Sequence, residues 1–435
     1  MTAAEVSVPV LNARIPGSKS LTNRAVLIAA GARGTSRVRA PLVSDDTIAF
    51  RNALTECGVR VESSPLSEFW EVTGTGRGPV GRARLWCADA GTAARFLPPY
   101  VATGRGTFLV NGSSQLRARP QRPLLEALRN LGADVETSPG DGLPLLVRAD
   151  GLTGGEITVD SSLSSQYLSG LLMAAPLMEH GLVVRAEALV SSPYVDMTVT
   201  LMRCFGARVD ERPDGSLRVE PGGYTATDVV IEPDASTASY VFAAAAVTGC
   251  TVAVPGLAAG SPQGDLRFAD VLEKVGARVA VTDTATSVTG TARLRGGFAV
   301  HMGDISDTFM TLAAIAPLAD APVTIHGIGH ARLKESDRIA AVAQNLRACG
   351  IETHQGDDWI TVHPGELRPA RIACHRDHRI AMAFSVLGLA VPGSITLDDP
   401  QCVAKTFPDF HTEMRRLFPA YEHPCAVGET AEEDR

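Results

Sequence analysis

The chain of 435 residues is long enough for two or three domains, each with its own core. Its hydrophobic content of 45% and charged content of 20% are typical of a globular protein and exclude a disordered or fibrous chain. The formal net charge of −8 argues against a nucleic-acid-binding protein or a partner of anionic membranes. Any anionic ligand therefore needs cations that are concentrated locally.

Cysteine and histidine spacing gives no sign of a metal site. The eight cysteines are scattered without a CxxC pair, which indicates reduced thiols in a cytoplasmic protein. His375 and His378 form an HxxH pair, but no neighbouring spacing completes a ligand set. We expect neither a bound metal nor disulfides, and we expect the acidic tail, 421–435, to be disordered.

Two uncharged runs approach the length of a membrane span, and the N-terminus lacks the pattern of a signal peptide. The runs cover 240–260 and 380–397, and Pro255 and Pro392 interrupt them. We interpret them as buried helices that continue into strands, and we expect no membrane association.

One repeated element ends on glycine. It reads "LTECGVRV", "LRNLGADV", "MRCFGARV", "LEKVGARV" and "LRACGIET", at intervals of roughly 72 residues. The pattern predicts a helix that ends on a left-handed glycine and turns into a strand. The predicted glycines are Gly58, Gly132, Gly206, Gly276 and Gly350.

A second element begins with small polar or charged residues and continues as an apolar helix. It recurs six times, and its copies are marked by Ser20, Thr92, Ser165, Ser236, Ser306 and His378. The second copy contains Pro98 and Pro99, so we expect that helix to kink or to end early. Strand-like runs such as "GEITVD" and "TVAVPG" separate the helices. The sequence therefore predicts an α/β protein of six units, three in each of two domains.

Cations and hydroxyls gather at the repeated helix starts, where unpaired backbone N–H groups favour anions. The residues are Lys19, Ser20, Arg24, Arg95, Ser164, Ser165, Gln166 and Arg379. If these starts converge, they form a cleft that holds more than one phosphate or carboxylate. The "GSKS" stretch is not a nucleotide-binding P-loop, because the GxxxxGK glycine spacing is absent.

Lysine is rare, and three of the four lysines lie in charged motifs: Lys19, Lys334 and Lys405. This distribution indicates that lysine is used where a compact ammonium is needed, and arginine elsewhere. Candidate acid–base groups lie in similar places: Asp307 at a helix start, and Glu335 between Lys334 and Arg338. Lys334 and Arg338, which are four residues apart, would share a helix face if that segment is helical. Taken alone, this string is better interpreted as a solvated surface ion-pair cluster.

Nine short motifs, taken in the order in which they occur, resemble those of a known family. They are "PGSKSLTNR", "AGTAAR", "RARP", "SSQYLSGLLMAAP", "DASTASY", "QGD", "LKESDR", "DHRIAM" and "AKTFPDF", between about residues 10 and 418. In this order they resemble the 5-enolpyruvylshikimate-3-phosphate synthase family. The resemblance implies two domains of three βαβαββ units, an inside-out α/β barrel. Their expected bounds are 16–231 and 1–15 with 232–420, and helix ends face a cleft.

The resemblance also implies the reaction: transfer of the carboxyvinyl group of phosphoenolpyruvate to the 5-hydroxyl of shikimate 3-phosphate, with release of phosphate. It implies no metal or organic cofactor, and we expect a cytoplasmic monomer. We further expect shikimate 3-phosphate to close the domains and to strengthen phosphoenolpyruvate binding, because the open cleft is a cage of repelling cations.

Family roles carried over by position divide the residues into three groups. Those expected at shikimate 3-phosphate are Lys19, Ser20, Arg24, Ser164, Ser165, Gln166, Ser191, Tyr194, Asp307, His330 and Lys334. Those expected at phosphoenolpyruvate are Lys19, Gly91, Arg119, Gln166, Arg338, Arg379 and Lys405. Asp307 would accept the hydroxyl proton, and Glu335 with Lys19 would deliver a proton to carbon.

Four positions depart from the family pattern: Asp89, Phe96, Gln115 and His330. Gly91 is retained, which resembles the form that is sensitive to glyphosate, a competitor of phosphoenolpyruvate. Alternatives are a UDP-N-acetylglucosamine enolpyruvyl transferase, which typically has Lys-Asn at the Lys19 motif and a cysteine in the loop near Arg119, and a non-catalytic paralogue that binds a phosphorylated metabolite. An RNA-terminus enzyme with similar repeats conflicts with the acidic charge balance.

Overall fold

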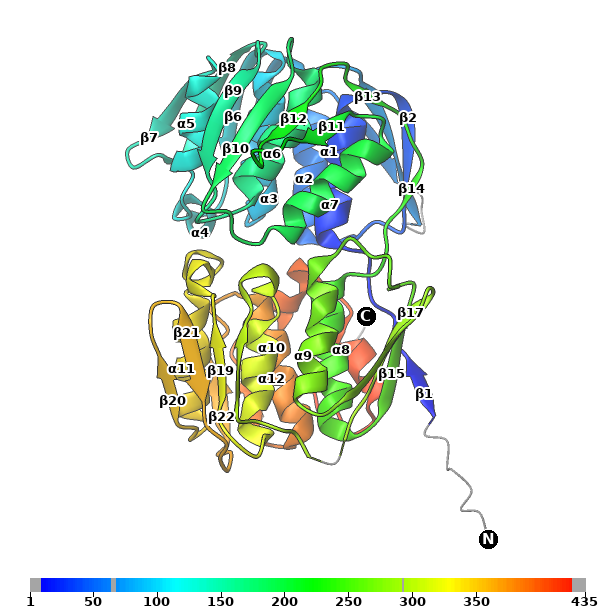
Figure 1. Cartoon of the computed structure of the whole chain (residues 1–435), viewed down its shortest axis with the longest axis vertical. Coiled ribbons are helices and arrows are strands. Elements are labelled where there is room, and N and C mark those ends of the chain that lie inside the picture. Colours follow the sequence, from blue (N-terminus) through cyan, green and yellow to red (C-terminus); the bar gives the residue numbers. More distant parts are fainter. Residues whose placement is uncertain (1–8, 64–67, 292, 425–435) are drawn as a thin grey trace, which may run out of the picture. The chain divides into compact units, whose positions relative to one another are not determined.

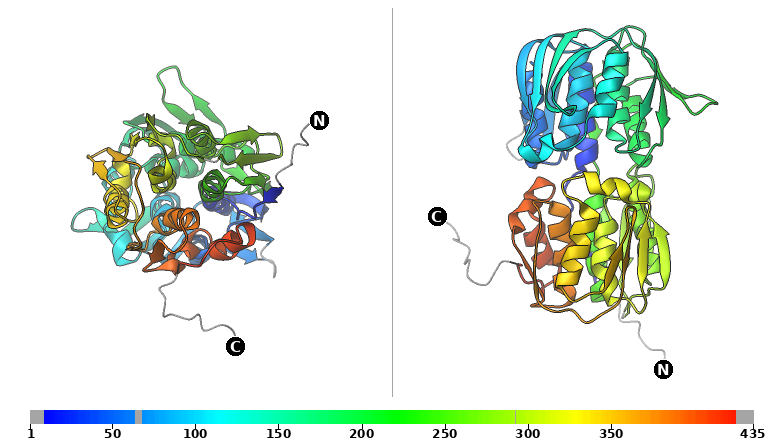
Figure 2. Two further views of the ribbon diagram at one scale, coloured as in Figure 1. Left: turned by 90° about the horizontal axis from the view of Figure 1, so that it is seen from below. Right: turned by 90° about the vertical axis from the view of Figure 1, so that its left-hand side faces the viewer.

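The computed structural model describes residues 9–63, 68–291 and 293–424. The chain divides into two compact units (Figures 1 and 2). The inserted unit is Pro16–Glu232, and the split unit is Met1–Ile15 with Pro233–Arg435. Most of the predicted disordered tail, residues 425–435 with Cys425, lies outside the described residues.

The inserted unit contains three repeats of helices and strands. The first comprises α1 (Lys19–Gly31), β2 (Ala32–Arg39), α2 (Asp45–Glu56), β3 (Arg60–Ser63) and β4 (Phe69–Thr75). The second comprises β5 (Val80–Trp86), α3 (Gly91–Ala102), β6 (Arg105–Asn111), α4 (Ser114–Arg117), α5 (Arg122–Asn130), β7 (Asp134–Ser138) and β8 (Gly142–Asp150). The third comprises β9 (Gly155–Asp160), α6 (Gln166–Ala174), β10 (Leu182–Glu187), α7 (Pro193–Cys204), β11 (Val209–Glu211) and β12 (Leu217–Val219).

Each repeat of the inserted unit forms its own sheet. The strand orders are β5-β6-β8-β7 and β11-β12-β10-β9 in the second and third repeats. In the first repeat, β2 pairs with β4, and the returning strands β13 (Tyr224–Thr225) and β14 (Val229–Val230) lie parallel to β2. The end of the unit thus supplies the strand that the first repeat lacks, and this closes the βαβαββ pattern.

The split unit repeats the arrangement. Its first repeat has β1 (Val10–Asn12), α8 (Ala235–Thr248), β15 (Thr251–Pro255), α9 (Phe268–Lys274), β16 (Arg278–Val281) and β17 (Ala285–Thr289). The next has β18 (Phe298–His301), α10 (Phe309–Ile315), β19 (Val323–His326), α11 (Arg338–Ala348), β20 (Thr353–Gln355) and β21 (Trp359–Val362). The last has β22 (Ala370–Ile372), α12 (His378–Ala390), β23 (Ile395–Leu397) and α13 (Phe410–Leu417).

The sixth repeat differs from the predicted equal units. Its described sheet has only β22 and β23, because the chain then forms a 3₁₀ helix at Pro400–Lys405 and α13 in place of two further strands. Other 3₁₀ turns lie at Ala175–Leu177, Gly264–Arg267, Gly303–Ile305, Ala316–Leu318 and Gly329–Leu333. Strand β1 pairs in parallel with β15, so the N-terminal segment completes the fourth repeat.

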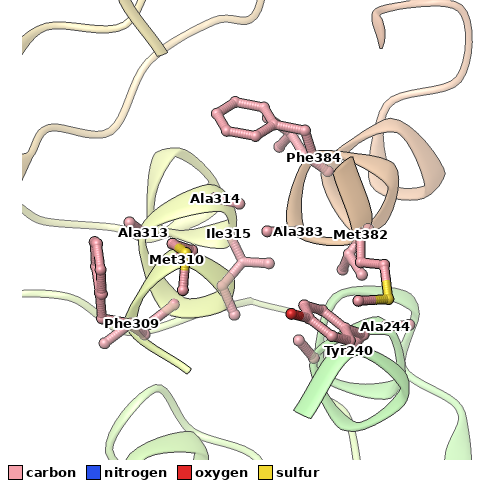
Figure 3. Packing of buried hydrophobic residues seen from close by; sticks show 14 of the residues in the cluster. Tyr240, Ala244, Phe309, Met310, Ala313, Ala314, Ile315, Met382, Ala383 and Phe384 are labelled. Atoms are coloured by element: carbon pink, nitrogen blue, oxygen red, sulfur yellow. The ribbon is translucent and has the colours of Figure 1, made fainter. Parts of the chain in front are cut away.

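Within each unit the strands lie outside and three apolar helices run inside them (Figures 1 and 2). These inner helices are α1, α3 and α6 in one unit and α8, α10 and α12 in the other. They are hydrophobic on nearly all sides, as expected for helices that are buried all round. Figure 3 shows Tyr240 and Ala244 of α8 near Ile315 of α10 and Met382 of α12. The six inner helices start within about three residues of the predicted markers, which confirms the second repeated element.

Helix α3 corrects one half of a prediction. It contains Pro98 and Pro99 but continues to Ala102, so it does not end early, and a kink at the prolines stays a prediction. Each proline removes one backbone hydrogen bond, and the complete burial of α3 supplies packing that compensates for this loss. Gly170 of α6 allows close approach, because a Cβ there would lie 2.6 Å from the Arg95 carbonyl oxygen.

The glycine-ended element is confirmed. The five predicted glycines follow α2, α5, α7, α9 and α11 and have φ of 86°, 86°, 84°, 98° and 82°. This left-handed conformation is one that side chains disfavour. The two long apolar runs are also as predicted: α8 leads into β15, and α12 leads towards β23. Among the described residues, no helix is long and apolar enough to cross a membrane.

Candidate active site

Lys19 is the first residue of α1, and the structure gives its ammonium a carboxylate partner. The Ser18 hydroxyl caps the helix by accepting a hydrogen bond from the Leu21 N–H at 3.4 Å. Lys19 Nζ lies 3.2 Å from Asp46 Oδ2, in the first turn of α2. The Asp46 side chain is only 3% exposed, so this is not a solvated surface pair. Sequence reasoning missed Asp46, although its place beside a helix start is a usable signal.

Arg24 lies one turn after Ser20 and is almost fully buried. Its guanidinium donates to neutral oxygens: Thr198 Oγ1 at 2.7 Å, and the carbonyls of Ser20 and Tyr194 at 3.1 and 3.2 Å. Burial lowers the pKa of Arg24 to about 10, which still leaves it charged at neutral pH. Arg24 therefore joins α1 to α7 and fixes the backbone of two residues expected at shikimate 3-phosphate. Its predicted direct contact with that ligand stays a prediction.

Phe96 belongs to the same cluster and accounts for one departure from the family pattern. Its ring lies under Arg24, with the guanidinium carbon 5.2 Å from the ring centroid. It also packs against Phe50 at 6.4 Å between centroids. An aromatic ring at this position therefore stabilises a buried cation whose other partners are neutral.

The start of α6 presents hydroxyls and an amide. Ser164 and Ser165 are buried, and the Ser164 hydroxyl accepts from the Gln166 N–H at 3.2 Å. Gln166 Oε1 is buried without a hydrogen-bond partner in the described part of the chain. An unsatisfied buried acceptor costs about 1–3 kcal/mol, and such atoms are expected where a ligand donates.

Ser191, which precedes α7, lies in strained backbone. It is buried and has a φ of 54°, which is uncommon for a residue with a side chain. Its carbonyl accepts from the Tyr194 N–H at 3.2 Å. Strain of this kind persists only where the surrounding structure holds it, and it is concentrated at functional sites.

Gly91, Arg95 and Arg119 meet at the start of α3. A Cβ on Gly91 would lie 2.7 Å from Arg119 Nη1 and 2.8 Å from Arg95 Nη1. Arg95 Nη1 donates to the Gly91 carbonyl at 3.0 Å, and Arg119 is 7% exposed. Two guanidinium groups and a helix start thus share a space that only glycine leaves open.

Asp89, another departure, organises the loop that leads to Arg119. The Ser113 hydroxyl donates to Asp89 Oδ1 and also accepts from the Leu116 N–H at 3.2 Å. Asp89 therefore anchors the short helix α4, which lies just before Arg119. Gln115 is half-buried in the same helix. What Asp89 and Gln115 do to ligand affinity stays untested.

In the split unit, Arg338 is the centre of a buried ion cluster. Its Nη1 lies 2.9 Å from Asp307 Oδ1, its Nη2 lies 2.7 Å from Glu335 Oε2, and its Nε lies 2.9 Å from Asp377 Oδ2. The Arg338 side chain is 2% exposed and that of Asp377 is fully buried. Glu335 and Arg338 are therefore not part of a solvated surface cluster, which corrects the interpretation of "KESDR" taken alone.

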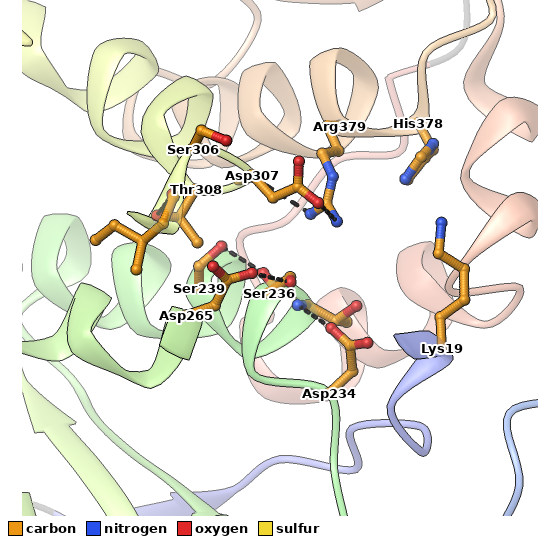
Figure 4. Close-up of polar contacts among 12 residues, drawn as sticks. Lys19, Asp234, Ser236, Ser239, Asp265, Ser306, Asp307, Thr308, His378 and Arg379 are labelled. Carbon is orange, nitrogen blue, oxygen red and sulfur yellow. Dashed lines mark hydrogen bonds and ion pairs between the residues drawn. The ribbon is translucent and has the colours of Figure 1, made fainter. Parts of the chain in front are cut away.

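Asp307 is shared between two arginines. Arg379 Nη2 lies 2.7 Å from Asp307 Oδ2, and Arg379 Nη1 donates to the Asp307 backbone carbonyl at 3.2 Å. Figure 4 shows this pair where α10 and α12 begin, beside the start of α8. Burial alone would raise the pKa of Asp307, but Arg379 and Arg338 together hold that pKa far below its usual range.

Lys405 completes the cluster. Its Nζ lies 3.5 Å from Glu335 Oε1. Arg338, Arg379 and Lys405 thus face Asp307, Glu335 and Asp377, and the six charges balance. The expectation of a cage of repelling cations is wrong for the split unit, because each of these cations contacts a carboxylate.

Lys334 and Arg338 do not share a helix face. The segment before Arg338 is a 3₁₀ turn that ends at Leu333, and α11 begins only at Arg338. Asp337 caps α11 by accepting from the Ala340 N–H at 3.0 Å, which fixes the helix start at that point. Lys334 lies outside the helix and is half-buried.

His330 is buried and contacts the start of the α10 segment. Its Nε2 lies 2.8 Å from the Ser306 hydroxyl. Burial, with Lys334 nearby, lowers the pKa of His330 to about 4, so the ring is neutral at neutral pH. His330 can therefore offer a hydrogen bond but no charge to an anionic ligand.

Within each unit the structure brings many of the predicted residues together. In the split unit these are Asp307, Glu335, Arg338, Arg379 and Lys405, and in the inserted unit Arg119 lies beside Gly91 and Arg24 contacts Ser20 and Tyr194. Sequence reasoning missed Asp377, which holds Arg338 and also caps α12 by accepting from the Arg379 N–H at 3.1 Å. Its place before the apolar helix is the signal of an N-cap.

Comparisons with known proteins agree on one family. The family model described as EPSP synthase (3-phosphoshikimate 1-carboxyvinyltransferase) matches residues 10–414. A 3-phosphoshikimate 1-carboxyvinyltransferase of Nostoc punctiforme is 42% identical over 422 residues, which are 95% of this chain and 99% of that protein. One from Vibrio atlanticus is 40% identical over 93% of this chain and 96% of its own length.

Solved structures show the same fold. An EPSP synthase from Acinetobacter baumannii superposes with a TM-score of 0.77 at 25% identity, over 94% of this chain and 97% of that chain. The enolpyruvyl transferase NikO from Streptomyces tendae gives a TM-score of 0.76 at 20% identity, over 94% of each chain. The second likeness supports the fold alone.

The lowered pKa of His330 predicts a loss of stability in mild acid. Above the unfolded-state pKa of about 6.5 the ring is neutral in both states, so it contributes no pH dependence. As the pH falls from about 6.5 towards 4, His330 binds a proton in the unfolded state but stays neutral in the folded state, so the free energy of unfolding decreases. At about pH 4.5 we expect this group to account for about 2 kcal/mol of the loss.

Urea unfolding of the wild type and of His330→Gln, at about pH 7 and about pH 4.5, measures this contribution. The variant should lose about 2 kcal/mol less than the wild type between the two pH values, because other titrating groups are common to both. Equal losses in the two proteins would show that His330 protonates in the folded state as readily as in the unfolded state.

Proposed function

The chain belongs to the EPSP synthase family and is a 3-phosphoshikimate 1-carboxyvinyltransferase of the shikimate pathway, and on this basis we propose which of its residues perform the transfer. The reaction joins the carboxyvinyl group of phosphoenolpyruvate to the 5-hydroxyl of shikimate 3-phosphate. The two substrates carry two phosphates and two carboxylates, so cations are needed merely to hold them together. The observation that supports the assignment most strongly is the buried cluster around Arg338.

We assign phosphoenolpyruvate to two groups of residues. Arg338, Arg379 and Lys405 of the split unit supply three cations, and Arg119 with the Gly91 N–H supplies a fourth cation and a helix start. Guanidinium groups bind phosphate and carboxylate oxygens in pairs, which orients the enol as well as holding it.

Shikimate 3-phosphate is assigned mainly to the inserted unit. Ser20, Ser164, Ser165, Ser191 and Tyr194 provide hydroxyl and backbone groups, and Arg24 holds two of these segments in place. The buried Gln166 Oε1 suits a substrate hydroxyl donor. From the split unit, Lys334 and the neutral His330 are assigned to the same substrate.

Asp307 is the proposed base, but its ion pairs make it a weak one. A carboxylate whose pKa is held far below its usual range has little tendency to take a proton from a hydroxyl. Both arginines that lower this pKa are also assigned to phosphoenolpyruvate. We propose that the bound substrate draws Arg338 and Arg379 away from Asp307, so that the pKa of Asp307 rises. Each unit of that rise makes proton transfer to Asp307 more favourable by about 1.4 kcal/mol.

Glu335 is the proposed proton donor to the methylene carbon, and Lys19 acts beside it. Glu335 now contacts Arg338 and Lys405, and Lys19 contacts Asp46. The same exchange of partners would allow Glu335 to hold a proton. Addition then forms the bond between the substrate oxygen and carbon 2 while carbon 3 gains a proton. Elimination removes that proton again and releases phosphate.

We further propose a monomer in the cytoplasm. The seven cysteines in the described part of the chain are reduced, as expected for a reducing compartment.

Replacement of the base gives the sharpest test of this function. For Asp307→Asn we expect kcat, measured as phosphate release with both substrates, to fall by about 10²–10⁴-fold. In the same variant, phosphoenolpyruvate should bind several-fold more tightly in the presence of shikimate 3-phosphate, because Arg338 and Arg379 no longer have a competing carboxylate. Fluorescence or calorimetric titration measures that affinity.

The control is Asp304→Asn, three residues away, whose carboxylate pairs with the half-exposed Arg267 at 3.4 Å. It should leave both quantities nearly unchanged. If Asp307→Asn turned over substrate at the wild-type rate, Asp307 could not be the base. A parallel loss of kcat and of phosphoenolpyruvate affinity would mean that Asp307 supports the site and does not compete with the substrate.

Gly91→Ala tests the assignment of Arg119. The added methyl group would collide with both guanidiniums at the start of α3, so we expect the KM for phosphoenolpyruvate to rise about tenfold or more and the KM for shikimate 3-phosphate to stay the same. Inhibition by glyphosate, expected in the wild type because it competes with phosphoenolpyruvate, should weaken in parallel.

A double-mutant cycle with Arg119→Gln provides the control for Gly91→Ala. The two changes should be strongly non-additive, because the methyl group acts by displacing Arg119. Additive effects would show that Gly91 acts elsewhere, and a change confined to shikimate 3-phosphate would contradict the assignment of this helix start.

A further inference from the structure

Two histidines and a glutamate lie together on the outer face of the β18-β19-β21-β20 sheet, outside the residues assigned above. Side chains alternate along a strand, so Glu352 and His354 share a face while Thr353 between them points inwards and is buried. The register pairs Thr353 with Val362, and the His363 N–H donates to the Glu352 carbonyl at 3.0 Å. His363 is therefore the cross-strand neighbour of Glu352.

The three side chains converge at a single point. One ligand atom from each of Glu352, His354 and His363 can be chosen so that all three lie within 4.8 Å of one another. His354 Nε2 lies 3.0 Å from Glu352 Oε1, and the rings of His354 and His363 are 5.4 Å apart between centroids. No other such group of three occurs within the residues that the structure describes.

We propose that Glu352, His354 and His363 form a binding site for a divalent transition-metal ion of the Zn²⁺ class. Imidazole nitrogens suit zinc, copper and nickel, and a carboxylate completes the three-ligand set that leaves a tetrahedral position for water. Glu352 and His354 are exposed and His363 is half-buried, so the site suits a structural clip and not a metal-dependent reaction. Its three ligands take no direct part in the carboxyvinyl transfer.

The backbone beneath the site is already fixed. Arg347 of α11 donates twice to the Thr353 carbonyl, at 3.1 and 2.8 Å, which holds the edge strand β20 from below. The hydroxyls of Thr324 and Thr361 lie 2.9 Å apart across β19 and β21. A metal ion therefore has to order only three side chains, so the conformational entropy lost on binding is small.

The consequence of binding follows from the other end of the same hairpin. Arg332 donates to the carbonyls of Gly356 and Asp357 at 2.5 and 2.9 Å, and the Asp358 carboxylate accepts from the Ile328 N–H at 3.1 Å. The β20–β21 hairpin thus supports the segment 327–337, which carries His330, Lys334 and Glu335. A metal ion that joins β20 to β21 stabilises the sheet edge on which this segment rests.

Calorimetric titration of the full-length protein with Zn²⁺ tests the site, after accessible thiols have been alkylated so that exposed Cys204 does not compete. We expect one ion per chain with a Kd of about 100 μM or tighter. His354→Gln and His363→Gln should each weaken binding by about tenfold or more. Saturation with Zn²⁺ should raise the Tm of the wild type by several degrees and leave the Tm of both variants nearly unchanged.

The chain supplies a matched control in His301 and His326, which form a second histidine pair on β18 and β19 of the same sheet, with ring centroids 5.2 Å apart. His326→Gln should leave Zn²⁺ affinity as in the wild type. A wild-type Kd weaker than about 100 μM overturns the proposal, and so does an affinity that survives both His354→Gln and His363→Gln. Because none of His354, His363 and His326 is buried, unfolding midpoints without metal should be close to the wild type in every variant.

Discussion

The charge balance around Arg338 constrains the chemistry of the split unit. A buried guanidinium needs partners that compensate for its lost hydration, and here three carboxylates supply them, Asp307, Glu335 and Asp377. The same carboxylates include the proposed base and the proposed proton donor. An anionic substrate that binds to Arg338, Arg379 and Lys405 therefore competes with the groups that must act on it. Binding and activation of the acid–base residues are, on this account, one event.

The repeated fold explains how such a cluster forms from distant parts of the chain. The inner helices α8, α10 and α12 are mostly apolar along their length, and the charged residues of these segments lie at or just before the helix starts. In the split unit the starts of α8, α10 and α12 lie together, which places Asp234, Asp307 and Arg379 in one region (Figure 4). A glycine in the left-handed conformation ends each of the helices α2, α5, α7, α9 and α11 and turns the chain sharply towards the next strand.

The sequence was informative about periodicity and less informative about partners. The six helix starts and five glycine ends could be predicted because hydrophobic spacing and glycine have local physical causes. The pairing of Asp377 with Arg338 and of Asp46 with Lys19 could not, since the tertiary fold brings these residues together and no spacing rule encodes it. The continuation of α3 past Pro98 was likewise decided by packing, since every residue of that helix is buried. Glu352 and His363 are neighbours only through the register of β20 and β21.

In the proposed mechanism, phosphoenolpyruvate replaces Asp307 as the partner of Arg379. A crystal structure of the protein with shikimate 3-phosphate and an unreactive analogue of phosphoenolpyruvate would reveal this exchange. We expect the Arg379 Nη2–Asp307 Oδ2 contact, now 2.7 Å, to be broken, Arg379 to contact the analogue, and Asp307 to turn to the substrate hydroxyl. An unchanged contact between Arg379 and Asp307 with the analogue bound would contradict it.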